Sequence, residues 1–372
     1  MYPNLYYAVK DLFGIEIGFL KIIQSFGFFV ALSFLMGSYF FSLELKRKEN
    51  EGLLKPVEVP VLSKKTISFF DFALSLLLGF LIGYKLIYII FNFDAFKENT
   101  QQGILSLKGN LIGGLLLGAI ALLLKIRETR QLARTHFVPS TLIVHPYDHI
   151  GAMTTIAAIS GLIGAKIFHN LENWDLFLKD PMDALLSFSG LTMYGGLIFG
   201  AVSVIWYAHK NNINVRHLID ASAPGLMLAY GVGRIGCQVA GDGDWGIDNT
   251  APKPSWMSFL PDWCWAYSYP HNVLNEHLNA PVFPTPLYEA LISIALFFFL
   301  WSIRRKIKTP AVLFCIYLLL NGIERFFIEK IRINTQYHIF GHGITQAEII
   351  SFLLVLTGLI GIAWFKKKPA LA

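Results

Sequence analysis

The sequence has few cysteines and none of the common metal-binding or nucleotide-binding motifs. Its three cysteines, Cys237, Cys264 and Cys315, form no CxxC pair, so neither a disulfide framework nor a cysteine-rich metal site is expected. No HExxH pattern occurs among the ten His, and no GxxxxGK[ST] loop that could hold phosphates is present. We therefore expect no metal, no cofactor and no nucleotide-driven pump.

Charged residues are also scarce. They make up 15% of the 372 residues, whereas 54% are hydrophobic. Several apolar runs reach about 20 residues, the length that spans the hydrocarbon core of a bilayer. The formal net charge is +6, but the basic residues cluster beside the apolar runs, as in cytoplasmic loops of membrane proteins, so nucleic acid is not an expected partner. The composition predicts an all-α, polytopic protein of the lipid bilayer.

Apolar windows with polar flanks predict nine transmembrane helices. Their ranges are 17–41, 66–91, 103–124, 148–170, 190–208, 218–240, 286–303, 310–330 and 345–365. If the N-terminus lies outside and the C-terminus inside, most Lys and Arg fall in inside segments, as the positive-inside rule requires. The basic residues left outside are Lys10, Lys97, Lys179, Lys253 and Arg332. We predict one N-out, C-in integral membrane domain over residues 1–372.

An internal echo lies in the first half of the chain. LIGYKLIYIIFNFDAF at 81–96 resembles LIGAKIFHNLENWDLF at 162–177, and GGLLLG at 113–118 recurs as GGLIFG at 195–200. The shared Gly, Lys and aromatic-Asp positions favour a duplicated helix pair at 66–124 over a shared membrane composition. Two added helices leave the orientation of all later spans unchanged.

The longest stretch between predicted spans, 241–285, lies outside in this topology and is rich in Trp, Pro, Gly and Asn. A loop of this length is usually functional or disordered. Its aromatic residues favour an ordered external loop that lies over the membrane surface.

Two arginines, Arg234 and Arg325, occur inside predicted spans. A charged side chain at bilayer depth costs roughly 2.5–3.5 kcal/mol on insertion scales, so it persists mainly where it faces protein, water or a ligand. In the predicted topology, polar groups from five helices converge on the outer half of the membrane: Lys166, Tyr194, Arg234, Tyr288, Glu289, Arg325, Glu329 and Arg332. The i, i+4, i+7 spacing of the last three puts them on one helical face.

Each arginine also has a structural interpretation. Arg234 lies in the Gly-rich segment GVGRIG, and a guanidinium suits a phosphate diester, but Asp242 or Asp244 could pair with it instead. Arg325 has Glu329 one helical turn away, so an intrahelical ion pair competes with ligand binding.

The other polar candidates have ordinary roles to weigh as well. A lysine near a helix end, such as Lys166, commonly reaches for the membrane interface. Tyr194 and Tyr288 suit an aromatic belt. The adjacent Gly195 and Gly196 are typical of close packing between helices.

At these positions the sequence resembles the prolipoprotein diacylglyceryl transferase family. The segment GVGRIGCQVAGDGDWG resembles the signature G-x-x-x-G-R-x-G-N-F-x-N-x-E-x-x-G. Further motifs are similar in GLIGAKIFHNLENWDLF, LTMYGGLIFG, FPTPLYEAL, NGIERFFIEKIR and GITQAEIIS. They occur in family order from Asp148 to the C-terminus, which makes 148–372 the family-like core and 66–124 an insertion.

The resemblance implies a multi-pass enzyme of the bacterial cytoplasmic (inner) membrane with its active site toward the outer leaflet. It transfers a diacylglyceryl group from phosphatidylglycerol to the lipobox cysteine in the signal peptide of prolipoproteins. The resemblance makes Arg234 and Arg325 catalytic, with Arg234 on the lipid phosphate. It assigns substrate binding to Arg234, Lys166, Gly195, Gly196, Asp242, Tyr288, Glu289, Glu329 and Arg332.

Some positions depart from the family pattern. Tyr194 replaces the histidine before GGLIG, Lys166 replaces an arginine, and Cys237 replaces an asparagine. Catalysis then relies on Tyr194 or on another base. Two alternatives stay open: a non-catalytic lipid-binding or lipoprotein-binding homologue of the same fold, and a transporter, since repeats often build transporters.

Overall fold

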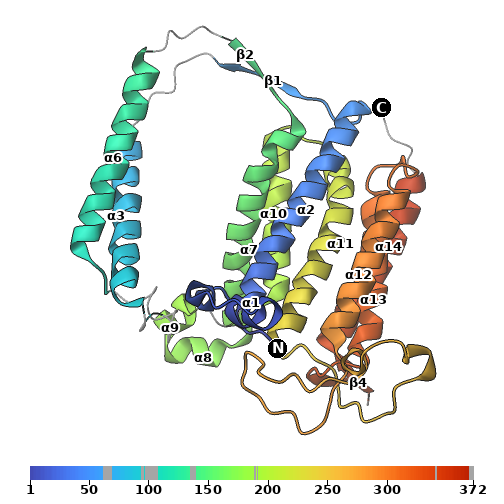
Figure 1. Ribbon diagram of the computed structural model, residues 1–372. Coiled ribbons are helices and arrows are strands. Elements are labelled where there is room, and N and C mark those ends of the chain that lie inside the picture. The colour runs from blue at the N-terminus through green and yellow to red at the C-terminus, as the bar shows by residue number, and fades with distance from the viewer. Residues whose placement is uncertain are drawn as a thin grey trace. The chain divides into compact units, whose positions relative to one another are not determined.

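The structure is a computed structural model (Figure 1) that describes residues 1–61, 69–93, 96, 108–134, 140–187, 190, 192–339 and 342–367. The described chain is mostly helical and has two small two-stranded sheets. It forms two compact units. The first comprises Met1–Lys55, Pro146–Ile156 and Ser203–Ala372, and the second comprises Pro56–His145 and Ala157–Val202.

The first unit is built around helix α11 (Val215–Ala240). Helices α2 (Ser25–Asn50) and α12 (Thr285–Ile303) pack against it, and α13 (Val312–Glu329) contacts both α11 and α12. The last helix, α14 (Gln346–Lys367), packs against α13 (Figure 1). This arrangement brings helices from the beginning, middle and end of the chain into contact.

Glycines set the close approach of these helices. A Cβ atom on Gly225 of α11 would lie 2.8 Å from the carbonyl oxygen of Gly37 on α2. One on Gly236 would lie 2.8 Å from the Cβ atom of Phe29. Larger residues would separate the backbones, which is why small residues are common where membrane helices pack.

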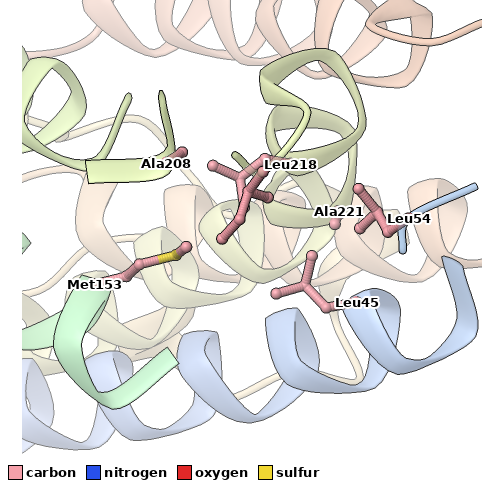
Figure 2. Packing of buried hydrophobic residues seen from close by; sticks show 7 residues of the cluster. Leu45, Leu54, Met153, Ala208, Leu218 and Ala221 are labelled. Atoms are coloured by element: carbon pink, nitrogen blue, oxygen red, sulfur yellow. The ribbon is translucent and has the colours of Figure 1, made fainter. Parts of the chain in front are cut away.

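One apolar cluster joins α2, the start of α7 (Ile150–Glu172), the end of α10 (Met193–Lys210) and α11. Figure 2 shows Leu45, Met153, Ala208 and Leu218 among its members, and all four are at most 2% exposed. A second cluster joins α2, α11, α12 and α13 through the buried residues Met227, Leu228, Val232, Phe297, Leu300 and Leu313. Together the clusters hold α11 along its length.

Asp220 of α11 fixes the beginning of α13. Its carboxylate accepts hydrogen bonds from the backbone N–H groups of Ala311, at 2.7 Å, and Phe314, at 2.9 Å. The Ala311 backbone has φ 71°, a left-handed conformation that is uncommon for residues other than glycine. Because free N–H groups at a helix start attract an anion, this buried carboxylate caps α13 from a neighbouring helix.

The helix observed near the predicted first span, 17–41, begins and ends later in the sequence. Residues Gly18–Ile22 form a 3₁₀ turn after the short helix α1 (Leu5–Phe13), and α2 begins at Ser25 and continues to Asn50. The polar end of α2 stays helical because Arg47 pairs with Glu44 and Glu51 within the helix, and Arg304 of another segment also pairs with Glu44.

The second unit contains the helix pair α3 (Phe69–Phe91) and α6 (Leu111–Arg134). It also contains most of α7, the first part of α10, and the short helices α8 (Trp174–Lys179) and α9 (Pro181–Leu186). Strands β1 (Val57–Val61) and β2 (Ser140–Val144) pair antiparallel, with Val61 opposite Ser140. The chain segments that lead to α3 and follow α6 are therefore held side by side.

The internal echo has a structural counterpart in the first helix pair. In α3 and α6, a Cβ atom on Gly83 would lie 2.2 Å from the Gly113 carbonyl oxygen. The Nζ atom of Lys85 donates a 2.9 Å hydrogen bond to the Lys108 carbonyl oxygen, and the Asn110 N–H donates to the Tyr84 carbonyl oxygen.

The pair α7 and α10 makes contacts of the same kinds. A Cβ atom on Gly164 would lie 2.4 Å from the Gly195 carbonyl oxygen. Lys166 donates a 2.9 Å hydrogen bond to the carbonyl oxygen of Ser187, and Thr192 donates its N–H to the carbonyl oxygen of Ala165. The glycine contact and the N–H hydrogen bond correspond between the two pairs, whereas the carbonyl that accepts from the lysine comes from a different position. The two corresponding contacts support the duplication inferred from the sequence echo.

The prediction of a mostly helical chain with membrane-long helices is confirmed. Five helices of the described residues are long and apolar enough to cross a membrane: Ser25–Asn50, Asp71–Phe91, Pro146–Glu172, Thr285–Ile303 and Gln346–Lys367. Helices α6, α10, α11 and α13 overlap the other four predicted ranges. The count of nine spans and their orientation stay predictions. Parts of the predicted ranges 66–91, 103–124 and 190–208 lie outside the described residues.

Candidate active site

Arg234 lies near the end of α11, and its residue is only 7% exposed. Gly231 lies one turn earlier, where a Cβ atom would come 3.2 Å from Ser293 of α12. Without a side chain there, α12 approaches closely and carries its own polar residues to Arg234. The glycine-rich segment thus places a guanidinium inside a helical interface.

Two carboxylates hold Arg234. Its Nε atom lies 2.8 Å from an oxygen of Glu289 on α12, and its terminal nitrogen donates to Asp244, which follows α11. Glu289 is fully buried, whereas the side chain of Asp244 is 31% exposed. The partner that the sequence left open between Asp242 and Asp244 is therefore Asp244, and Glu289 is a second partner.

Arg325 and Arg332 complete an arginine cluster, a name used below for Arg234, Arg325 and Arg332. Arg325 of α13 donates to Glu289 at 2.6 Å, and Arg332, just after α13, donates to Glu289 at 3.3 Å and to Asp244. All three guanidinium groups therefore share the Glu289 carboxylate. Their side chains are 8%, 17% and 8% exposed, so the site keeps three guanidinium groups and the carboxylates that pair with them largely away from solvent.

The predicted helical face of Arg325, Glu329 and Arg332 is present only in part, because α13 ends at Glu329 and Arg332 follows it in an isolated bridge with Gly246. Glu329 lies 3.2 Å from Arg325 in an i, i+4 ion pair. Its other oxygen accepts a 2.6 Å hydrogen bond from Asn334. The intrahelical ion pair that was expected to compete with ligand binding at Arg325 is present. Arg325 also donates to Glu289 on a different helix.

The pKa values of Asp242 and Asp244, two residues apart, are shifted in opposite directions. The pKa of Asp242 is raised by burial and by the charge of Asp244. Burial alone would also raise the pKa of Asp244, but Arg234 and Arg332 outweigh it and the net shift is downward. Environments that push two carboxyl pKa values apart separate a proton-holding group from an ionised one.

The segment 241–284 is an ordered loop of the first unit. Trp245, Tyr269 and Val282 form a small core, each at most 4% exposed. Tyr288 of α12 fastens the loop to the helix by donating a 2.8 Å hydrogen bond to the Cys264 carbonyl oxygen. The loop thereby holds Asp244 in place, and Tyr288 is engaged with the loop rather than with the arginine cluster.

The remaining predicted site residues belong to the second unit. Lys166 donates to the backbone and hydroxyl oxygens of Ser187, at 2.9 and 3.0 Å. Tyr194 is half-buried at the start of α10. Gly195 and Gly196 follow it and face α7 at Gly164 and Gly161. Their observed contacts fit helix packing.

Three polar residues of the site escaped the sequence reasoning. The Tyr230 hydroxyl donates to Glu289 at 3.2 Å, and its ring lies 5.2 Å from the guanidinium carbon of Arg234. Asn334 bonds Glu329. Glu324, adjacent to Arg325, is buried at 5% exposure. A carboxylate that continues the i, i+4, i+7 row of Leu313, Tyr317 and Leu320 is a signal that could have marked Glu324.

A metal ion is a poor fit. Within the described residues, one group has suitable ligand atoms close together: Cys237, Asp242 and Asp244. Asp244 already accepts from Arg234 and Arg332, and a fixed positive charge beside the position opposes a cation. The same charges favour an anion, and three guanidinium groups suit the oxygens of a phosphate.

Comparisons with known proteins point to one family of transferases. The sequence model of the family described as "Prolipoprotein diacylglyceryl transferase" matches residues 129–364. A phosphatidylglycerol–prolipoprotein diacylglyceryl transferase of Leptospira interrogans is 27% identical over 261 residues, which cover 57% of this chain and 77% of the relative. A Dehalococcoides mccartyi protein of the same name is 28% identical over 211 residues, covering 56% and 74%.

A third relative, phosphatidylglycerol–prolipoprotein diacylglyceryl transferase 2 of Clostridium perfringens, is 28% identical over 214 residues, covering 57% of this chain and 77% of the relative. The family match contains α11 to α13, and thus every member of the arginine cluster. It begins after most of α6, so α3 lies outside it. The chain belongs to the prolipoprotein diacylglyceryl transferase family.

Proposed function

We propose that this protein transfers a diacylglyceryl group from phosphatidylglycerol to the lipobox cysteine thiol of prolipoproteins. The observation that carries the proposal is the arginine cluster, which concentrates three guanidinium groups inside the helices of a chain of this family. The donor lipid carries its reacting carbon on a phosphate diester. A buried group of arginines is suited to hold that phosphate and to stabilise the charge that grows on it.

Lipid phosphate takes the position of Asp244 in this proposal. Asp244 is on a loop and partly exposed, and it bonds to two members of the cluster, Arg234 and Arg332. Glu289 is fully buried and contacts all three arginines, so it stays and keeps them together. Exchange of one carboxylate for one phosphate leaves the net charge of the site nearly unchanged, which lowers the electrostatic cost of binding.

The reaction is a displacement at carbon. The cysteine sulfur attacks the glycerol carbon that bears the phosphate ester, the carbon–oxygen bond breaks, and glycerol phosphate leaves with the electron pair. Arginines fixed before the reaction stabilise the leaving anion without reorganising, and they act more strongly where water is excluded. The thiol must lose its proton, because the thiolate is the nucleophile.

Further residues that the family resemblance assigns to the site are part of the proposal. Tyr194 provides a hydroxyl for hydrogen bonding to substrate, and Lys166 adds a positive charge. Gly195 and Gly196 let backbone and lipid approach closely, and Asp242, Tyr288, Glu289, Glu329 and Arg332 complete the substrate site. No cofactor takes part.

The membrane arrangement is proposed together with the activity. Nine spans cross the bacterial cytoplasmic membrane with the N-terminus outside and the C-terminus inside, as one integral membrane domain. The arginine cluster then lies in the outer-leaflet half, where the lipobox of an exported signal peptide and the donor lipid both reach it. The loop 241–285 covers the outer surface, and 66–124 is an inserted helix pair.

Complementation tests the activity. Bacterial cells depleted of their own transferase should modify a reporter lipoprotein when they express this chain. They should lose that modification with Arg234→Ala and keep it with Arg305→Ala, which removes an exposed arginine of the α12–α13 connection. Tyr194→Phe shows whether the hydroxyl is required. Failure of a well-expressed, membrane-inserted wild type would contradict the transferase and favour a lipid-binding homologue.

A further inference from the structure

Glu324 differs from the other carboxylates around the arginine cluster. It is 5% exposed, and among the described residues neither of its oxygens accepts a hydrogen bond. Glu289, Asp244 and Glu329 each form ion pairs with members of the cluster. Glu324 forms no such pair with a described residue, although it is adjacent in sequence to Arg325.

The helical period directs Glu324 into the interior shared by α11, α12 and α13. It follows Leu313, Tyr317 and Leu320 at spacings of i, i+4, i+7 and i+11, and those three residues belong to the apolar cluster between these helices. Glu324 therefore lies at the end of an apolar stripe, where the next members of an ordinary core would be apolar too.

Charged and titratable groups of several elements interact electrostatically with Glu324. They are Tyr230 and Arg234 of α11, Glu289 of α12, Arg325 of its own helix, and Arg332 of the segment after α13. The three arginines attract the Glu324 carboxylate, and Glu289 repels it. Glu324 is thus electrostatically part of the site without being bonded to it.

Stability does not account for a glutamate at this position. A buried carboxylate without hydrogen bonds is unfavourable, and a second carboxylate nearby increases the cost. The three arginines are already matched by the three carboxylates that bond them. Glu324 is an additional acid in a balanced cluster.

Transfer of the proton from the substrate thiol needs a carboxylate of this kind as acceptor. A carboxylate held by arginines is a weak base, because the guanidinium groups stabilise its ionised form. The three bonded carboxylates are for that reason poor acceptors for a thiol proton. Resting on the transferase proposed above, we propose that Glu324 is the catalytic proton acceptor, which takes the proton of the substrate cysteine and passes it to the departing phosphate.

The step is balanced. The S–H bond breaks and its proton binds a Glu324 oxygen, while the sulfur electron pair forms the bond to the glycerol carbon. The carbon–oxygen bond of the lipid breaks and leaves its electron pair on the phosphate oxygen. Glu324 then gives its proton to that phosphate, and glycerol phosphate departs with Glu324 ionised again. No further acid, base or oxidant is required.

The test uses the full-length protein in phosphatidylglycerol nanodiscs with a synthetic lipobox peptide as acceptor. Glu324→Gln keeps the shape of the side chain and cannot take up the proton. We expect its kcat to fall 10²–10⁴-fold, the usual contribution of a positioned base, with KM for phosphatidylglycerol within a few fold. The wild-type kcat should decline toward low pH as the acceptor protonates, and the variant should lack that decline.

Two further variants keep the test decisive. Glu324→Ala should regain part of its kcat when formate is added, because formate supplies the missing carboxylate, an effect that a merely structural residue would not show. Glu348→Gln is the matched control: Glu348 pairs with exposed Lys330 on a neighbouring segment and caps α14 through Thr345, which glutamine also does. Its kcat and pH profile should equal those of the wild type.

A Glu324→Gln protein with wild-type kcat and pH profile would overturn the proposal. So would an acidic decline that disappears in Asp242→Asn and persists in Glu324→Gln, because Asp242 would then be the acceptor. An inactive wild type would overturn the transferase assignment itself and this inference with it. A folded Glu324→Gln variant is verified by an unchanged or raised Tm, since the substitution removes a buried charge.

Discussion

Arg234, Arg325 and Arg332 remain buried because carboxylates from three parts of the chain surround them. Glu289 comes from α12 and Asp244 from the loop after α11, so no single helix could assemble the site. Breaking a buried ion pair by removing one partner usually costs more than the pair contributes, since a charge is left uncompensated. Substitution of any one member should therefore destabilise the fold, independently of its effect on substrate binding.

Asp244 offers a pH-dependent test at this scale. Because the two arginines hold its pKa below the ordinary value, it stabilises the fold above about pH 4, and that contribution disappears as pH falls through the lowered pKa. Asp244→Asn should destabilise the protein at pH 7 by roughly 1–3 kcal/mol, since the group is partly exposed. Thermal unfolding followed from pH 7 to pH 3 should show the difference shrinking at acidic pH. A constant difference would contradict the ion-pair explanation.

The residues of the site were predictable to different degrees. Arg325 and Glu329 could be grouped because helical spacing puts them on one face, and the structure has the corresponding ion pair. Arg332 lies after the end of α13 and joins the site through Asp244 and Glu289 instead. Arg234 could be singled out because a guanidinium among glycines in an apolar span needs a partner. The shared partner, Glu289, depends on how α12 packs against α11, and the sequence contains no local signal for that contact. Glu324 was missed because it is adjacent to Arg325, and the i, i+4 spacing of Arg325 and Glu329 already offered an ion pair.

At the scale of elements, glycines determine which helices touch. The contacts of Gly83 with Gly113 and of Gly164 with Gly195 are equivalent, and each brings two backbones closer than any side chain would permit. The sequence echo includes the same glycines, and the duplication inferred from it stays a prediction that these contacts support. The apolar run did not predict the boundaries of α2, because ion pairs of Arg47 extend that helix beyond the run.

Substitution of these glycines measures the packing. A Cβ atom on Gly164 would lie 2.4 Å from a backbone oxygen and 2.5 Å from Phe199, so Gly164→Ala should lower Tm and destabilise the α7–α10 pair by about 1–3 kcal/mol, as overpacking does. Gly151→Ala on the same helix is the control. It meets nothing within 4 Å and should be neutral or slightly stabilising, because alanine favours helix. Equal Tm values for the two variants would contradict the close contact.

For the whole molecule, the β1–β2 ribbon holds together the two ends of the segment that contains α3 and α6. Val57 is paired with Val144 and Val61 with Ser140, so both ends of the intervening segment are held side by side. The family match begins at residue 129 and contains the arginine cluster. These two facts support the proposal that the inserted pair is dispensable for the chemistry.

Deletion of the pair tests that proposal. Replacing residues 62–139 with a two-residue Asn-Gly turn should preserve the ribbon, because such a turn joins antiparallel strands at this spacing. We expect the shortened protein to complement transferase-depleted cells to within a few fold of the full chain. Arg234→Ala in the shortened protein serves as the inactive control. A shortened protein that inserts stably but modifies no lipoprotein would assign the pair a part in the reaction.

The capping of α13 by Asp220 has a consequence for the distant arginines. Asp220 and Arg234 lie fourteen residues apart on α11, and Ala311, which Asp220 holds at the start of α13, lies fourteen residues before Arg325. At 1.5 Å per residue, each arginine lies about 21 Å along its helix from the hydrogen bond that joins α11 to the start of α13. Because one buried carboxylate fixes the start of α13 against α11, a change at Asp220 should shift the position of Arg325 along its helix relative to Arg234.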